Sequence, residues 1–275
     1  MIEIPEAITL ANQLNQTIRN KKIIRAAANS SPHKFAFYYG EPEEYGERLS
    51  GKTIGEAKPY SGRVEIEIED VILHFNDGAN LRFYDAGAKL PAKHQLLVEF
   101  EDGASLVVTI SMYAGIMCTP PGAMDDNMYY RASKESISPL SDAFNYAYFE
   151  TLFDEKSLKM SAKAFLATEQ RIPGLGNGVL HDILLNAKIH PKKKINTLTE
   201  AQKHAVFDSV KVTLAEMTAA GGRDTERDLF GNFGGYVTKL SKNNVAMLCR
   251  DCGGHVKKEA YLGGSIYYCD SCQEK

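Results

Sequence analysis

Tryptophan is absent from this chain of 275 residues, so any stacking on a nucleic-acid base would fall to tyrosine or phenylalanine. An excess of positive charge is also absent, because the formal net charge is −3 and the isoelectric point is about 6.2. This balance argues against a strongly basic nucleic-acid-binding protein, although a local basic face is compatible with it. The hydrophobic content of 44% and the charged content of 24% are those of an ordinary globular protein.

The sequence has no apolar run long enough to span a membrane and no recognisable secretory signal segment. We therefore expect a cytoplasmic protein without a membrane partner. A length of 275 residues is enough for two hydrophobic cores and one small additional module.

Cysteine is scarce, yet four of the five cysteines form the most specific pattern in the chain. Two residues separate Cys249 from Cys252 and Cys269 from Cys272, and sixteen residues lie between the pairs. This spacing predicts one tetrahedral zinc ion, which is structural because no ligand position stays open. The alternative, two disulfides, requires an oxidising compartment. Cys118 is expected to be a buried filler rather than a nucleophile, since no base motif lies near it.

Residues 1–120 predict a β-sandwich with a helix at its edge. Apolar residues recur at helical spacing from Ile8 to Ile18, and Pro5 precedes them where a first helical turn tolerates proline. Over residues 64–69, apolar residues alternate with glutamates, which predicts a strand with one dry and one solvated face. Two hairpins are expected, joining 71–75 to 81–84 through Asn76-Asp77-Gly78 and joining 96–100 to 106–110.

Residues 121–138 are loop-like in composition and are assigned to a linker between domains. Periodicity then predicts a helical domain over 139–240, followed by a four-cysteine zinc finger with a β-hairpin over 241–275. The predicted fold class is therefore α+β. The expected helices cover 144–153, 156–166 and 179–187, and a fourth runs from Thr199, capped with Gln202 as its partner, to Gly221-Gly222.

A glycine-rich turn, Gly174-Leu175-Gly176-Asn177-Gly178, stands between two of these helical patterns. Backbone N–H groups at such a turn suit a phosphate, and Asn177 adds a side-chain amide. Taken alone, the turn reads as an ordinary helix–helix connection. Together with the preceding Gln170-Arg171, the following His190-Pro191 and the zinc module, it becomes a specific signal.

With these motifs the chain resembles the formamidopyrimidine-DNA glycosylase and endonuclease VIII family over essentially its whole length. The opening Met1–Glu6 is similar to the family's N-terminal motif, residues 174–191 to its helix–two-turns–helix motif, and the cysteines to its zinc finger. The resemblance implies a monomer that binds damaged or abasic DNA between its domains and flips the base. It also implies base-excision repair in a bacterial nucleoid context, with the amine of an N-terminal proline attacking the sugar C1′, an imine forming and β-elimination following.

The resemblance places the catalytic residues at the N-terminus. Glu3 matches the family's acid/base glutamate and Glu6 a second glutamate of the same motif. The alternative for both is a solvated first helical turn favoured by the helix dipole. Ile2 stands where the family has its catalytic proline. Because such a bulky second residue favours retention of Met1, the terminal amine is displaced by one residue from its usual place.

The resemblance also implies the DNA contacts. Asn177, with the backbone at Gly174 and Gly176, matches the phosphate-binding turn. Arg63 falls where the family has a phosphate-binding lysine, and Met112 and Tyr113 fall in the loop that fills the space of the flipped base. Lys163 and the run 192–194 are expected to add charge, although a basic run is more often a solvated end. Gly264 stands where the family's finger has arginine.

Three functions remain open from the sequence. The first is a DNA glycosylase, with or without abasic-site lyase activity, that recognises and excises damaged bases or processes abasic sites. The second is a DNA-binding protein that keeps the fold but has weakened or lost catalysis. The third is a glycosylase without lyase activity, in which Glu3 activates water. The resemblance also implies that the loop at 228–236 closes over the flipped base.

Overall fold

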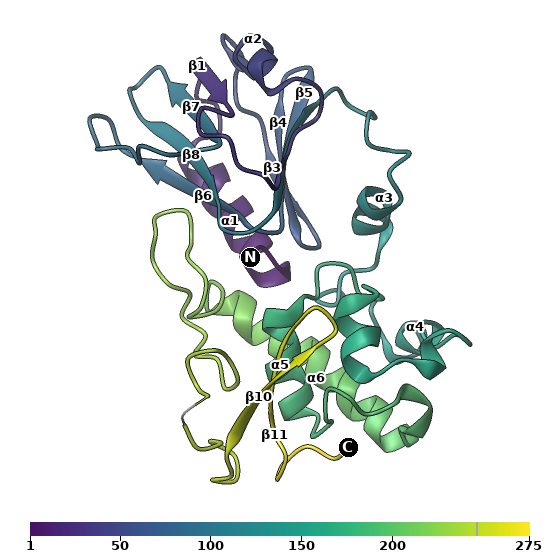
Figure 1. Ribbon diagram of the computed structural model, residues 1–275. Coiled ribbons are helices and arrows are strands. Elements are labelled where there is room, and N and C mark those ends of the chain that lie inside the picture. The colour runs from purple at the N-terminus through teal and green to yellow at the C-terminus, as the bar shows by residue number, and fades with distance from the viewer. Residues whose placement is uncertain (246) are drawn as a thin grey trace. The chain divides into compact units, whose positions relative to one another are not determined.

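The computed structural model describes residues 1–245 and 247–275, which form two compact units (Figure 1). The first unit contains Met1–Lys134 together with a later segment, Glu226–Gly234. The second contains Glu135–Thr225 and Gly235–Lys275. Among the described residues, no helix has both the length and the apolar character needed to cross a membrane.

The first unit is a sandwich of two sheets, which confirms the predicted fold class. One sheet has the order β1-β7-β8-β6, and its strands are β1 (Ile23–Ala28), β6 (Ala79–Tyr84), β7 (Leu96–Phe100) and β8 (Ser105–Ile110). The other has the order β2-β9-β5-β4-β3, and its strands are β2 (Ala36–Phe37), β3 (Ala57–Tyr60), β4 (Arg63–Ile68), β5 (Val71–Asn76) and β9 (Ala114–Thr119). Of these neighbours, β2 and β9 run parallel and the others antiparallel.

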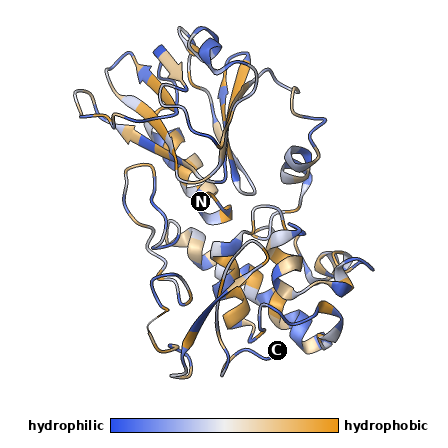
Figure 2. Cartoon of the chain, viewed as in Figure 1, coloured by the Kyte–Doolittle hydropathy of each residue, from blue (hydrophilic) through white to orange (hydrophobic). Residues whose placement is uncertain are grey.

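Both sheets and the first helix share one hydrophobic core. Helix α1 (Ile4–Thr17) buries one face through residues at helical spacing, which are Ala7, Leu10, Ala11 and Leu14. The core continues into alternate residues of the strands, and Figure 2 shows both hydrophobic and hydrophilic residues on these strands. The unit also contains η1 (Pro42–Glu44) and α2 (Tyr45–Leu49), and its chain continues into α3 (Met128–Glu135).

One of the two predicted hairpins is wrong. Strand β5 pairs with β4 and β9, whereas β6 pairs with β8 in the other sheet, so Asn76-Asp77-Gly78 is a corner between the sheets. Asp77 has a φ of +51°, as hairpin turns also require, and local sequence therefore does not distinguish the two outcomes. The hairpin between β7 and β8 is confirmed.

The prediction that all the glutamates of β4 face solvent is also wrong. Glu67 is exposed, but only 4% of Glu65 is. Residues of α3 cover it, because Lys134 Nζ lies 3.1 Å from a Glu65 carboxylate oxygen. The covering helix is distant in sequence, so the alternation within β4 does not reveal it.

The second unit is helical, as expected, with a hairpin at its end. Its regular elements are α4 (Tyr146–Thr151), η2 (Ser157–Lys159), the π-helical turn η3 (Ala164–Thr168), α5 (Asn177–Asn186), η4 (Ile195–Thr197) and α6 (Glu200–Ala219). The capping box of Thr199 and Gln202 at the start of α6 is confirmed. The single helix predicted at 156–166 is broken instead, because Met160 is extended and Ser161 pairs with Lys194.

The C-terminal hairpin pairs β10 (Val256–Tyr261) with β11 (Gly264–Cys269) in antiparallel register. Its turn residues, Leu262 and Gly263, both have positive φ angles, of 48° and 71°. This is the pattern of a tight hairpin turn whose twist matches that of the strands.

Candidate functional site

The N-terminal amine is held inside the first unit. The Met1 ammonium forms an ion pair with the Glu226 carboxylate, and the next N–H, that of Ile2, donates to the carbonyl of Asp77 over 2.6 Å. The Ile2 side chain belongs to the hydrophobic core and is 6% exposed. Three contacts therefore fix the first two residues, and one of them occupies the amine itself.

Glu3 and Glu6, the predicted catalytic carboxylates, are both buried at the start of α1. The Glu6 carboxylate accepts the backbone N–H of Glu3 over 3.3 Å and so caps the helix. This capping gives Glu6 a structural role, whether or not it also takes part in catalysis. The Glu3 side chain in turn accepts the backbone N–H of Glu6, so both glutamates belong to the capping box at the end of the helix that adjoins the amine.

A small pocket adjoins the amine within the same unit. Its apolar lining comes from Ile2, Leu10, Ala79 and Leu81, and its polar lining from Met1, Glu6, Asn80, Arg82, Glu226 and Arg227. Burial lowers the pKa of Arg82, while nearby Asp228 opposes that shift. The lining of this small pocket therefore combines apolar side chains with charges of both signs.

The segment Glu226–Gly234, which supplies Glu226 and Arg227 to this pocket, is anchored on the sandwich. Leu229 is fully buried in the core, and its carbonyl accepts the Phe83 N–H over 2.9 Å. Gln13 of α1 donates to Asp228 over 3.0 Å. Sequence reasoning identified this loop but missed Glu226, since the partner of an N-terminal amine leaves no signal in the sequence.

Met112 and Tyr113 lie in the loop between β8 and β9. Their side chains are 59% and 41% exposed, while the loop backbone is fixed on the sheet corner. Gly78 N–H donates to the Tyr113 carbonyl over 3.0 Å, and Ser111 N–H donates to the Gly78 carbonyl over 3.2 Å. A side chain at position 78 would place its Cβ 2.8 Å from the Tyr113 oxygen, which explains the glycine. A side chain that inserts between stacked bases needs a fixed backbone and an exposed side chain, and both conditions are met here.

Arg63 begins β4 near the same corner. Its Nε donates to the Ser133 hydroxyl over 3.2 Å, and its guanidinium lies 5.9 Å above the Tyr130 ring. Burial lowers the pKa of Arg63, while the charge of Asp77 opposes that shift. Burial conversely raises the pKa of Asp77, and Arg63 and the N-terminal amine oppose it. Arg63, Asp77 and the amine therefore interact electrostatically within the first unit.

In the second unit, the glycine-rich turn has the backbone that its sequence predicts. Gly174 has a φ of +78° and Gly176 is extended, so α5 begins at Asn177. The Asn177 amide donates to the Ser265 carbonyl over 2.8 Å, while its oxygen is buried without a hydrogen-bond partner among the described residues. The side-chain donor predicted to bind phosphate is therefore engaged with the C-terminal hairpin.

Lys163 lies at the same place. It is 3% exposed, its ammonium donates to the Tyr261 carbonyl over 2.5 Å, and burial lowers its pKa. A Cβ at Gly264 would lie 3.5 Å from both the Asn177 amide nitrogen and the Lys163 ammonium. The position where the family's finger carries arginine is thus adjacent to both predicted phosphate-binding groups.

The basic run that follows is mostly paired internally. Lys192 forms an ion pair with Glu259, and the Lys193 ammonium lies 3.1 Å from Glu274. Lys194 donates to the Lys159 carbonyl over 3.1 Å. The first two of these charges are therefore partly neutralised before any ligand arrives.

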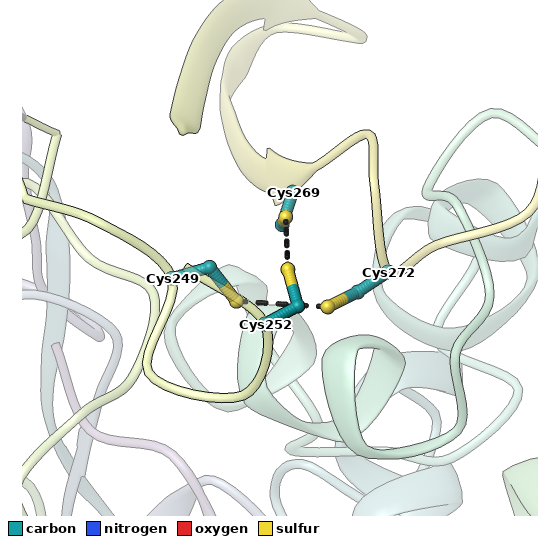
Figure 3. Close-up of side chains that lie close together, drawn as sticks. All are labelled: Cys249, Cys252, Cys269 and Cys272. Atoms are coloured by element: carbon teal, nitrogen blue, oxygen red, sulfur yellow. Dashed lines mark hydrogen bonds between the residues drawn. The ribbon is translucent and has the colours of Figure 1, made fainter. Parts of the chain in front are cut away.

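The four predicted metal ligands converge at the end of the chain (Figure 3). All four sulfur atoms lie within 4.8 Å of one another, with 3.7 Å between Cys249 and Cys272 and 3.6 Å between Cys252 and Cys269. Tetrahedral thiolates about 2.3 Å from zinc would be about 3.8 Å apart, whereas a disulfide needs about 2.05 Å. The donor set and its spacing therefore fit one tetrahedral metal ion. Cys118 lies elsewhere, buried in the sandwich, where burial raises the pKa of its thiol to about 11.

Comparisons with known proteins agree with this arrangement. Residues 136–228 match the model of the formamidopyrimidine-DNA glycosylase H2TH domain. Over the full length of both chains, the sequence is 26% identical to a formamidopyrimidine-DNA glycosylase of Lactococcus lactis subsp. cremoris. Over 99% of this chain and all of the relative, it is 26% identical to a protein of the same name from Wolbachia pipientis subsp. Culex pipiens.

Solved structures show the same fold. A crystal structure of Lactococcus lactis Fpg with DNA containing an abasic site superposes with a TM-score of 0.82 at 24% identity, covering 99% of this chain and all of that one. The Fpg protein of Thermus thermophilus gives a TM-score of 0.81 at 19% identity over 98% of each chain.

An N-terminal helix on a two-sheet sandwich, a helical unit and a four-cysteine hairpin are the architecture that this chain shares with these solved Fpg structures. The chain is thus similar over its full length to formamidopyrimidine-DNA glycosylases, and residues 136–228 match their H2TH domain.

Proposed function

We propose that this protein recognises damaged or abasic DNA in base-excision repair and that its N-terminal amine forms the covalent imine poorly or not at all. The contact between Met1 and Glu226 carries this proposal. An ammonium that donates a hydrogen bond to a carboxylate has no lone pair for attack on C1′. Ile2, buried in the core, fixes the amine one residue away from the family's position, and misplacement by about 1 Å can cost about a hundredfold in rate.

The relatives support the DNA-repair part of the proposal. Proteins that are similar to this chain over their full length are named formamidopyrimidine-DNA glycosylases. A structural neighbour is a complex with DNA that contains an abasic site. Binding should be strongest at such a site, because an abasic nucleotide costs least to unstack and flip.

A second candidate is a glycosylase without lyase activity. The burial of Glu3 at the amine end of α1 favours it, because a carboxylate in that place can take a proton from an attacking water while the base departs. Release of a damaged base without strand cleavage, abolished by Glu3→Gln, would support this candidate.

DNA contact should include the glycine-rich turn. Since the Asn177 amide is engaged by Ser265, we expect the backbone N–H groups of Gly174–Gly178 to meet the phosphate and Asn177 to hold the turn against the hairpin. Asn177→Ala should weaken binding about equally for all sequences, because phosphate contacts carry no base information. Asn196→Ala, at an exposed position, is the matched control.

The direct test is equilibrium binding of the protein to abasic and undamaged duplexes of the same sequence. We expect tighter binding to the abasic duplex and a loss of affinity for both in Asn177→Ala. Equal and weak binding of both duplexes by the parent protein would contradict lesion recognition, and unchanged affinity in Asn177→Ala would exclude the turn. We also propose that the cysteine site holds zinc as a structural ion.

A further inference from the structure

Helix α3 covers a network of buried polar groups on the five-stranded sheet. Glu65 of β4 and His74 of β5 are 4% and 3% exposed, and the Glu65 carboxylate lies 3.3 Å from His74 Nδ1 with poor hydrogen-bond alignment. The other ring nitrogen of His74 lies 2.7 Å from the Thr119 hydroxyl of β9. Three neighbouring strands thus contribute to one polar site inside the first unit.

The helix closes this site with two side chains. Lys134 donates to Glu65 over 3.1 Å and to the Tyr130 hydroxyl over 3.0 Å, and the Tyr130 ring packs edge-on against His74. Burial alone would raise the pKa of Glu65, but the neighbouring His74, Tyr130 and Lys134 hold it below its usual value. A charged, buried carboxylate therefore fixes the C-terminal turn of α3 to the sheet.

The same helical turn brings Ser133 to Arg63. The Ser133 hydroxyl donates its proton to the Tyr129 carbonyl over 2.9 Å, so its lone pairs are left to accept from Arg63 Nε over 3.2 Å. The Ser133 carbonyl in turn accepts from the Ser61 hydroxyl over 3.1 Å. The guanidinium of Arg63 is consequently held through its Nε atom.

Arg63 is itself partly exposed. Within residues 1–245 and 247–275, the two Nη groups of Arg63 make no hydrogen bond or ion pair. A guanidinium stays charged in proteins, and a partly buried one gains most from an anionic partner. Two parallel N–H donors fixed in direction match two oxygens of a phosphodiester.

We propose that α3 is a positioning element, in which Ser133 orients Arg63 for a DNA phosphate and Glu65 with Lys134 fixes the helix that carries Ser133. This rests on the proposed DNA-binding function for the identity of the anion. Arg63 is the residue that binds, whereas Ser133, Lys134 and Glu65 act through it.

The first test needs no DNA. In a protein with ¹⁵N-labelled arginine, the Arg63 Nε–H should exchange with solvent slowly in the parent and much faster in Ser133→Ala. Ser133→Thr keeps the hydroxyl and should restore slow exchange, and Met128→Ala, at an exposed position of the same helix, should change nothing. Equal exchange in the parent and Ser133→Ala would overturn the positioning role.

The second test measures affinity for an abasic duplex as a function of salt. Arg63→Ala should lower affinity about tenfold and reduce the salt slope by about one. Ser133→Ala should lower affinity about threefold in the parent but have no further effect in Arg63→Ala. A Ser133→Ala effect that persists without Arg63 would show a merely structural role and overturn the proposal. If the parent binds no DNA, the proposed function fails, while the exchange measurement still decides whether Ser133 positions Arg63.

Discussion

Residue 2 determines where the reactive amine stands. Ile2→Pro should allow removal of Met1 and leave a secondary amine at the place of the present Ile2 nitrogen, which lies 2.6 Å from the Asp77 carbonyl. The new amine would lose the Glu226 ion pair of Met1 and gain the family's position. We therefore expect borohydride trapping on abasic DNA to rise at least about tenfold. Mass spectrometry must confirm Met1 removal, and no increase in trapping would show that the rest of the site is also defective.

Glu226 is the second residue that bears on this chemistry. In Glu226→Gln the carboxylate partner of Met1 is lost, so the amine is released without a change in its position. We expect a smaller rise in trapping than in Ile2→Pro, about twofold to fivefold, since one charge-assisted contact is removed and the misplacement remains. Glu216→Gln, at an exposed position of α6, is the control for net charge. A loss of trapping in Glu226→Gln would instead make Glu226 a base.

Asp182 in α5 makes the stability of the second unit depend on pH. It is fully buried, accepts the N–H groups of Lys239 and Leu240 over 2.8 Å each, and burial raises its pKa to about 6. A raised pKa means that the contribution to stability is complete below pH about 4 and is lost as the pH rises through about 6, by about 3 kcal/mol in total. Urea unfolding between pH 4 and 7.5 should show this slope, and Asp182→Asn should flatten it. Parallel profiles for the two proteins would contradict this account.

At the scale of elements, the C-terminal hairpin is part of the helical unit, and we expect its folding to depend on a bound metal ion. Lys163, Asn177 and Gln273 donate to carbonyls that link the hairpin region to the helices. Removal of the metal with a chelator should therefore disturb amide NMR signals at residues 163 and 177 as well as those of the hairpin. Signals of the sandwich should stay unchanged. Metal analysis should return one zinc ion per chain, and its absence, or two disulfides, would contradict the prediction.

The elements that sequence predicted well are those defined by local chemistry. The capping box at Thr199, the glycine-rich turn before Asn177 and the cysteine spacing each depend on residues a few positions apart. The errors have non-local causes. Asp77 lies in a corner rather than a hairpin because β9 pairs with β5, and Glu65 is buried because α3 covers it.

The candidate site was predictable only where one segment supplies it. Glu3 and Glu6 follow from the N-terminal motif, whereas Glu226, more than two hundred residues away, pairs with Met1 through the fold alone. Ser265 and Tyr261 were missed as partners of Asn177 and Lys163 because they contribute backbone carbonyls, which any residue type provides.

For the whole molecule, the distribution of charge predicts weak electrostatic attraction to DNA. The net charge is −3, and Lys192 and Lys193 are already paired with glutamates. We expect the logarithm of the binding constant to fall as the logarithm of the salt concentration rises. The slope should be no steeper than about −4, because few phosphates are neutralised. A slope near −8 in a salt titration would show that DNA meets a more basic surface than the one described above.

The most direct test of the central claim is borohydride trapping by the unmodified protein on a duplex with one abasic site, alongside binding to the same duplex. We expect saturable binding, with no covalent adduct or only a trace, because Met1 is engaged by Glu226 and displaced by Ile2. Efficient trapping, with the adduct mapped to the amine of a retained Met1, would contradict it.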